Sequence, residues 1–210
     1  MKYVFVRHGE TVSNRQGTFS GVLDVALSDV GIKQAQSLCE YLINNYRFDK
    51  IYSSPLSRAK NTVKTLAEKT GLKIITDELL KEIFGGKWEG LKMDEIIRLY
   101  PEDMANWKKD MGNSRCTEGE SFFDVQKRAY EFLRKTAADS DDTVLVATHA
   151  GVIRSLVCGL KNLPIEKVGE INWVSNASIT EILYENGKFT LGKIGYNEFL
   201  TEITTLDDKF

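Results

Sequence analysis

The sequence predicts an α/β fold around a mostly parallel sheet, and two observations support this prediction. Short apolar runs typical of strands alternate with longer segments of helical periodicity over most of the chain. Near the end the pattern changes, and two strand-like runs are joined by Glu185-Asn186-Gly187, a sequence typical of a hairpin turn. We therefore expect a three-layer sandwich, with helices on both faces of the sheet and an antiparallel hairpin at one edge.

The expected strands are short, as strands buried in a parallel sheet usually are. Four of them alternate with helices, at residues 2–6, 49–53, 73–76 and 143–147, and the hairpin occupies residues 178–184 and 188–194.

The expected helices are recognised by apolar side chains that recur at intervals of three and four residues. The first begins after Ser28, a candidate N-cap, and the second after Ser54 and Pro55, which have the pattern of a cap and a first-turn proline. Ser121 with Asp124 has the pattern of a capping box for a third long helix. Shorter helical segments are expected at residues 93–100, 102–110 and 151–160.

Composition and length describe one ordinary globular domain. The chain has 210 residues, 42% hydrophobic and 28% charged, with a net charge of −2, so no basic surface suggests nucleic acid or an anionic membrane as partner. The three cysteines are far apart, which argues against a disulfide framework and favours a cytoplasmic location. No apolar run approaches the roughly 20 residues of a membrane span. We expect a single domain over residues 1–210, with a lid or insert at about 83–118.

The chain contains only two histidines, and each follows closely on a predicted strand. Arg7 and His8 lie at the end of the first strand, His149 lies at the end of the fourth, and Arg58 is in the first turns of the helix after the second. Because ligands of open parallel sheets bind beyond the carboxyl ends of the strands, all four side chains can reach one crevice. Guanidinium groups bind phosphate oxygens and a neutral imidazole can act as a nucleophile, so the cluster favours phosphoryl transfer.

Other chemistries fit these residues less well. A metal site is the main alternative, but the sequence has no HExxH or HxH pattern, and Arg7 would repel a cation beside His8. The glycine-rich stretch at residues 85–90 lacks the spacing of a phosphate-binding loop, and Ser20-Gly21 lacks the context of a hydrolase nucleophile elbow. We therefore expect neither a metal nor another cofactor.

A series of motifs in order resembles the signature of the histidine phosphatase superfamily, whose fold is that of the phosphoglycerate mutases. The series begins with Arg7-His8-Gly9-Glu10-Thr11 followed by Asn14, and it ends with Thr148-His149-Ala150-Gly151. Between them lie Phe19-Ser20-Gly21 with Asp24 and Leu27, Tyr52-Ser53-Ser54-Pro55-Leu56-Ser57-Arg58-Ala59 with Thr62, Glu82 before Gly85, Trp88, Glu89 and Gly90, and Glu118-Gly119-Glu120-Ser121.

The resemblance implies a role for each site residue. His8 is implied as the nucleophile that becomes a phosphohistidine, and Glu82 as the proton donor to the leaving alcohol and then the base for the attacking water. Arg7, Arg58 and His149 are implied to bind the transferring phosphoryl group and to spread its transition-state charge. Further substrate contacts are implied for Thr11, Asn14, Ser20, Gly21 and the backbone N–H of Ala150.

Several residues near these motifs have two interpretations. Glu10 is as well explained by a carboxylate that holds its loop or an arginine as by a catalytic role. Pocket lining and simple packing are equal alternatives for four aromatic residues, Phe19, Phe84, Trp88 and Trp107. The pair Lys108-Lys109 is expected on a solvated helix face.

Phosphatases and mutases share these motifs, and the departures favour a phosphatase. Mutases carry His-Gly-Asn where this chain has His149-Ala150-Gly151, and their insert before the Glu-Ser motif is longer. The resemblance is therefore closest to the short, cofactor-independent branch, which includes broad-specificity and α-ribazole phosphatases. It implies a metal-independent hydrolase of small phosphate esters, monomeric or homodimeric, with no nucleic-acid or membrane partner. Mutase-type phosphoryl transfer and a catalytically silent phosphate-binding or scaffold module are the alternatives.

Overall fold

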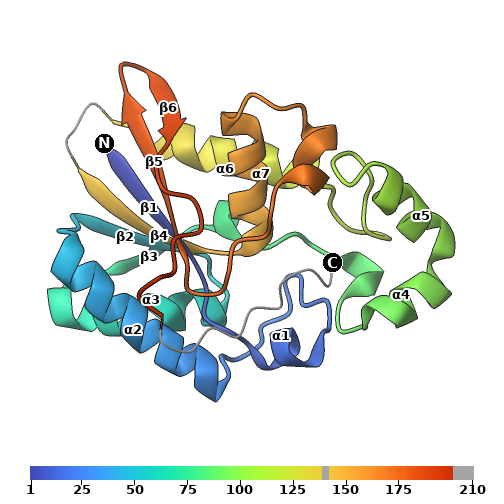
Figure 1. The fold of residues 1–210 in the computed structure, drawn as a ribbon, viewed down its shortest axis with the longest axis horizontal. Helices are drawn as coiled ribbons and strands as arrows, with labels where there is room; N and C mark the ends of the chain where they lie inside the picture. Colours follow the sequence, from blue (N-terminus) through green and yellow to red (C-terminus); the bar gives the residue numbers. More distant parts are fainter. Residues whose placement is uncertain (139–141, 201–210) are drawn as a thin grey trace.

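A six-stranded sheet forms the centre of the molecule, for which a computed structural model describes residues 1–138 and 142–200 (Figure 1). The strands are β1 (Lys2–Arg7), β2 (Lys50–Ser53), β3 (Ile74–Thr76), β4 (Thr143–Thr148), β5 (Ile179–Glu185) and β6 (Lys188–Leu191). They are arranged in the order β3-β2-β4-β1-β5-β6. The first four are parallel, whereas β5 runs antiparallel to β1, and β6 antiparallel to β5. The predicted mostly parallel sheet with a hairpin at its edge is confirmed.

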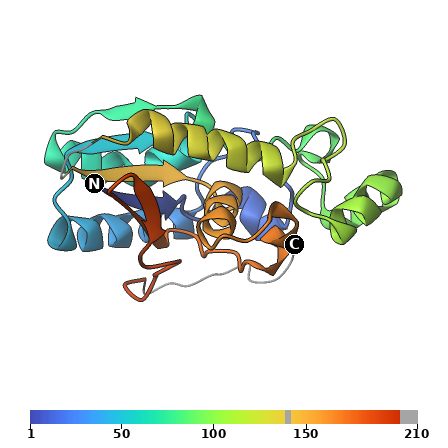
Figure 2. The same ribbon diagram turned by 90° about the horizontal axis from the view of Figure 1, so that it is seen from above.

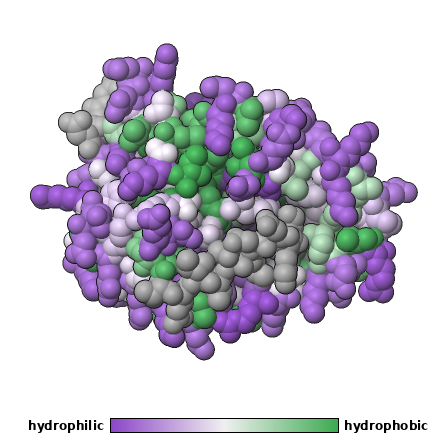
Figure 3. Space-filling view, in the orientation of Figure 1, coloured by the Kyte–Doolittle hydropathy of each residue, from purple (hydrophilic) through white to green (hydrophobic). Residues whose placement is uncertain are grey.

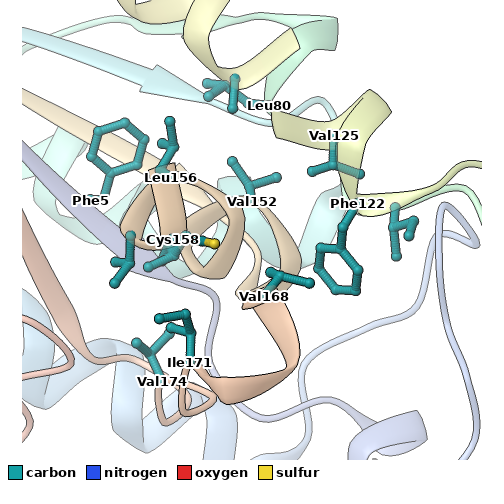
Figure 4. Packing of buried hydrophobic residues seen from close by; sticks show 14 of the residues in the cluster. Phe5, Leu80, Phe122, Val125, Val152, Leu156, Cys158, Val168, Ile171 and Val174 are labelled. Atoms are coloured by element: carbon teal, nitrogen blue, oxygen red, sulfur yellow. The ribbon is translucent and has the colours of Figure 1, made fainter. Parts of the chain in front are cut away.

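Helices cover both faces of this sheet because successive strand residues point to opposite sides. The long helices are α2 (Asp29–Asn45), α3 (Ser57–Thr70), α6 (Phe122–Thr136) and α7 (Ala150–Leu160). Val4 and Val6 of β1 belong to an apolar cluster with α2 and α3. Tyr3 and Phe5 point the other way, into a cluster with α6 and α7, where Figure 4 shows Phe5 next to Leu156. The three-layer prediction is therefore confirmed.

The helix starts follow the sequence signals at two of three positions. Ser28 caps α2, and Ser121 forms the predicted capping box at the start of α6. The prediction that Ser54 caps α3 is wrong, because that helix has Leu56 as its N-cap. The Ser54 hydroxyl instead lies 2.8 Å from Nε2 of His149. A tertiary contact with the site thus replaces the local cap.

The hairpin has the tight turn that its sequence predicts. Asn186 and Gly187 both have positive φ, 52° and 76°, as a two-residue type I′ turn requires. The strand β6 ends at residue 191 rather than 194, because Gly192 and Lys193 both form backbone hydrogen bonds with Glu181, so that two residues of one strand face one of the other. A single bridge at Tyr196 resumes pairing with β5 beyond this break.

The segment at 83–118 projects from one end of the molecule, where the lid was expected. It contains η2 (Gly86–Trp88), α4 (Met93–Leu99) and α5 (Pro101–Lys109), and both helices lie away from the sheet in Figures 1 and 2. Four short elements in the described part of the chain, α1 (Val12–Gln16), η1 (Glu78–Leu80), η2 and η3 (Ile165–Glu170), were not predicted, because one or two turns are too short to show a period. Figure 3 shows a mainly hydrophilic face with apolar patches, a small one lying over α4.

Candidate active site

A cavity of about 390 Å³ opens beyond the carboxyl ends of the parallel strands. One side is formed by the ends of β1 and β4 and the start of α3, and the other by the 83–118 segment. Eight of the predicted site residues line it: Arg7, His8, Asn14, Ser20, Gly21, Arg58, Glu82 and Ala150. Parallel strands thus bring together residues that are more than a hundred positions apart in the sequence.

His8 is held in the orientation and charge state of a nucleophile. Its side chain is buried, and Nδ1 lies 2.7 Å from the carbonyl oxygen of Gly9. A carbonyl only accepts, so Nδ1 carries the proton of the neutral ring and Nε2 keeps its lone pair. Burial, together with the charges of Arg58 and Arg7, holds the pKa of His8 well below its usual value. The imidazole is therefore neutral at cellular pH.

The two arginines place positive charge at the same end of the cavity. Arg58 is almost fully buried, and its Nη1 and Nη2 each donate a 2.7 Å hydrogen bond, to the carbonyl oxygens of Leu23 and Gly21. Arg7 donates from Nη1 to the carbonyl of Val174, at 2.6 Å. Carbonyl partners fix both guanidinium groups without cancelling their charge. Two such groups at one end of a pocket suit a doubly charged anion.

His149 lies behind the cavity rather than on its lining, with its ring 5.2 Å from that of His8. Ser54 Oγ accepts from the backbone N–H of Leu56 and can donate its own proton to Nε2 of His149. The proton of the neutral ring then belongs on Nδ1, which is buried and has no partner in the described part of the chain. Burial and the charge of Arg58 lower the pKa of His149 well below its usual value. Its Nδ1 is therefore a spare hydrogen-bond donor.

Glu82 lines the cavity and is oriented by backbone groups. Its carboxylate accepts from the N–H of Ile83 at 2.9 Å and from the N–H of Gly151, in the first turn of α7, at 3.2 Å. A side chain at position 151 would collide with this arrangement, since a Cβ there would lie 2.3 Å from Oε1 of Glu82. The absence of a side chain at Gly151 is thus what allows the carboxylate to reach the helix.

A buried asparagine that the sequence reasoning missed orients part of the site. Asn176 donates from Nδ2 to the carbonyl of His8 at 3.0 Å and to Oδ1 of Asn14 at 3.3 Å. Oδ1 of Asn14 also accepts from the N–H of Thr11, so the amide NH₂ of Asn14 is left for the cavity. In the sequence, Asn176 is a single asparagine just before the hairpin, and no motif with a fixed spacing marks it.

Two residues of the first loop serve the loop itself. Thr11 is fully buried, does not line the cavity, and caps α1 by accepting from the N–H of Asn14. Glu10 accepts from Arg15 at 3.0 Å and from the hydroxyl of Ser28 at 2.6 Å. The structure thus places Glu10 as a carboxylate that holds the loop, one of its two predicted interpretations.

The far side of the cavity is an unbroken series of rings. Neighbouring ring centroids are 5.2 to 6.1 Å apart in the order Phe19, Trp88, Trp107, Phe122, Trp173, and all five side chains line the cavity; we call them the aromatic wall. Phe84 lies outside it and is 42% exposed. Lys108 and Lys109 are exposed, as predicted, and Lys108 also lines the cavity.

Two features are absent from the parts of the chain with a described structure. No group of three or more His, Cys, Asp or Glu side chains there is placed to hold a metal ion. Within residues 1–138 and 142–200, no helix is long and apolar enough to cross a membrane.

A neutral, buried imidazole beside two guanidinium groups, one of them buried, at the end of a mostly parallel sheet, defines the class of this protein as a phosphoryl-transferring α/β enzyme. A profile of the histidine phosphatase superfamily (branch 1) matches residues 3–197. The chain therefore belongs to this superfamily, as its motifs indicated.

Several similar proteins are phosphatases by name. Phosphoserine phosphatase 1 of Hydrogenobacter thermophilus is 32% identical over 203 residues, which cover 96% of this chain and 95% of that protein. The adenosylcobalamin/alpha-ribazole phosphatase of Salmonella typhimurium is 32% identical over 165 residues, covering 78% and 81%. The structure of YhfR of Bacillus stearothermophilus superposes with a TM-score of 0.88 at 29% identity, covering 94% of this chain and 98% of that one. The predicted fold, family and phosphatase class are confirmed.

Proposed function

We propose that this protein hydrolyses phosphate monoesters of small metabolites through a phosphohistidine at His8. The observation that supports this most directly is the hydrogen bond from Nδ1 of His8 to the Gly9 carbonyl, which leaves a lone pair on Nε2 inside the cavity. The lowered pKa of the same ring keeps that lone pair free of a proton at cellular pH.

The first half-reaction forms a bond between Nε2 of His8 and phosphorus while the bond from phosphorus to the ester oxygen breaks. Arg7, Arg58 and the spare Nδ1–H of His149 stabilise the charge on the phosphoryl oxygens. Glu82, in its protonated form, gives a proton to the leaving oxygen, and the alcohol departs.

The second half-reaction returns the enzyme to its starting state. Water attacks phosphorus, the bond to Nε2 of His8 breaks, and the Glu82 carboxylate accepts a proton from the water. One water is consumed, and the products are an alcohol and inorganic phosphate. The backbone N–H of Ala150, at the start of α7, and the amide of Asn14 are further contacts for the phosphate.

The reaction is tested by trapping the intermediate. Wild-type protein incubated with a labelled phosphate ester and quenched should retain acid-labile phosphate, and His8→Ala should lose both the label and the turnover. Turnover is expected to persist in excess chelator, because no step uses a metal. Full activity of His8→Ala would contradict the proposal.

The general acid is tested by comparing leaving groups. Glu82→Gln should slow hydrolysis of alkyl phosphates by about 10²- to 10⁴-fold, because a poor leaving group needs its proton. Activated aryl phosphates should be affected much less. An equal loss for both classes of ester would count against this role.

Mutase-type transfer remains the alternative, since it forms the same intermediate and differs only in what accepts the phosphoryl group. Rapid interconversion of 2- and 3-phosphoglycerate with negligible hydrolysis of p-nitrophenyl phosphate would favour it. The three cysteines are free and buried, which supports a cytoplasmic location with reduced thiols.

A further inference from the structure

The part of the cavity that receives the leaving alcohol differs from the part that binds phosphate. Beyond Glu82 most of the lining consists of the aromatic wall and of three methionines, Met93, Met104 and Met111, and Thr18, Ile83 and Lys108 complete it. Rings and thioethers offer large polarisable surfaces, and methionine makes favourable contacts with aromatic groups. Most of this side of the cavity therefore contacts an apolar body, and only a small part of it can donate or accept hydrogen bonds.

Polar partners for the leaving alcohol are few beside the rings, and they are the side chains of Thr18, Ser20 and Lys108. Glu82 is the only carboxylate among the described residues that line the cavity, and the reaction itself uses it. The indole N–H of Trp88 is already bonded to Thr117, at 2.9 Å. A sugar or an amino acid would leave hydroxyl or ammonium groups unpaired against the wall, which costs binding energy for each buried group.

The wall is held from behind by a buried arginine that no motif includes. Arg154 of α7 is 4% exposed, and its guanidinium carbon lies 4.1 Å from the ring centroid of Trp173. Its Nη2 donates to the carbonyl of Gly169 at 2.8 Å, and its Nη1 lies 3.5 Å from the sulfur of Met111. One guanidinium thus fixes both a ring and a thioether of the cavity.

We propose that the substrates are phosphate monoesters whose alcohol carries an apolar, ring-containing body, and that Arg154 is a positioning residue for the surface that selects them. This proposal rests on the proposed function, because it names the leaving group of that reaction. At about 30 Å³ per water-sized group, the cavity of about 390 Å³ has room for about 13 such groups, which a phosphoryl group and an alcohol with one ring fill.

The substrate class is tested with esters of primary alcohols, so that the bond broken is the same and only the body of the alcohol differs. The full-length protein is assayed with 2-phenylethyl phosphate, O-phosphoserine, glycerol 1-phosphate and glucose 6-phosphate. Burial of the phenyl ring should raise kcat/KM by about 10- to 100-fold over the three polar esters.

The outcomes of this assay separate the two proposals. A kcat/KM for phosphoserine or glucose 6-phosphate equal to or above that for 2-phenylethyl phosphate would overturn the apolar substrate class and leave the phosphatase function intact. If no ester is hydrolysed in a His8-dependent manner, p-nitrophenyl phosphate included, the proposed function itself fails.

The role of Arg154 is tested by selectivity, which a general loss of stability would not change. Arg154→Met and Trp173→Ala should each lower the ratio of kcat/KM for 2-phenylethyl phosphate to that for glycerol 1-phosphate by about 10-fold, mainly through KM. Phe84→Ala is the matched control, since this ring belongs to the same end of the molecule but lies outside the cavity. If Arg154→Met folds and keeps the wild-type ratio, the positioning role is wrong. If it does not fold, Trp173→Ala with an unchanged ratio overturns the selecting role of the wall.

Discussion

The two ends of the cavity are built in different ways. At the phosphate end, most of the polar groups are held by hydrogen bonds to the backbone, as Arg58 is by two carbonyls. At the leaving-group end, rings contact rings and the lining comes largely from the 83–118 segment. The first end is suited to charge that develops in a transition state, and the second to the shape and polarity of one class of alcohol.

This contrast separates residues that act on the phosphoryl group from residues that contact the rest of the ester. Side chains that are fixed by hydrogen bonds to backbone carbonyls can change little without loss of the reaction. An apolar wall on a projecting segment can change without disturbing the sheet. Substitutions at the phosphate end should therefore affect all esters, whereas substitutions in the wall should affect some esters more than others.

The largest effect is expected at the phosphate end, from Arg58→Lys. Lysine keeps the charge but cannot span both carbonyls and a phosphoryl oxygen, so kcat/KM should fall by about 10²- to 10³-fold for every ester. Steady-state kinetics with one aryl and one alkyl phosphate would measure this. Arg15→Lys is the matched control, because that side chain is 55% exposed and bonds Glu10 outside the cavity. A loss confined to one class of ester would contradict the distinction between the two ends.

A second effect is expected where the two ends meet, from Gly151→Ala. The added Cβ would displace the Glu82 carboxylate, so alkyl phosphates should lose about 10- to 100-fold in kcat, while activated aryl phosphates lose little. This is the pattern expected for Glu82→Gln, in weaker form. Equal losses for both esters would show that Gly151 has a different role.

The phosphate end could be predicted from sequence because its residues are anchored to strand ends. A short apolar run followed by Arg7-His8, or by Thr148-His149, predicts both where these side chains lie and which way they point. The fold followed for the same reason, since alternating strand and helix periods leave few arrangements of a parallel sheet.

The leaving-group end could not be predicted, because its contacts join segments with no common spacing. The aromatic wall combines residues from four separate stretches of chain, and packing alone explains each of them equally well in the sequence. Ser54 is a second example of a position that tertiary contacts determine. Its sequence context indicates a helix cap, yet a contact with His149, 95 residues away, determines its place.

A smaller effect is expected from Asn176→Ala, which tests the support of the phosphate end. The change removes the donor to the His8 carbonyl and frees the Asn14 amide to rotate, so kcat/KM should fall by roughly 10-fold for all esters. Stability should fall by about 1–3 kcal/mol, because buried groups lose a partner. Asn172→Ala is the control, as Asn172 is exposed in the same segment. Kinetics with unfolding by denaturant would measure both, and unchanged values would show that Asn176 only fills space.

The smallest effect is one of pH on stability, and it too belongs to the phosphate end. His8 and His149 are neutral when folded because their pKa values are held well below the usual one, whereas in the unfolded chain they titrate near 6.5. Below about pH 6.5 the unfolded state therefore binds more protons, and the free energy of unfolding should fall as pH falls.

The carboxylates whose pKa is lowered in the folded protein contribute little to the pH dependence of stability between about pH 5 and 6.5. Burial opposes ionisation of Asp24, Asp124 and Glu181, but hydrogen bonds and nearby cations lower their pKa, so their contribution is lost only at more acid pH. The change of the free energy of unfolding with pH between about pH 5 and 6.5 therefore comes mainly from the two histidines. His149→Gln should reduce it, and inorganic phosphate should reduce it in the wild type, because a bound anion favours the protonated rings. Denaturant unfolding across this range measures the slope, and a wild-type slope of zero would mean that the two rings are not held neutral by their surroundings.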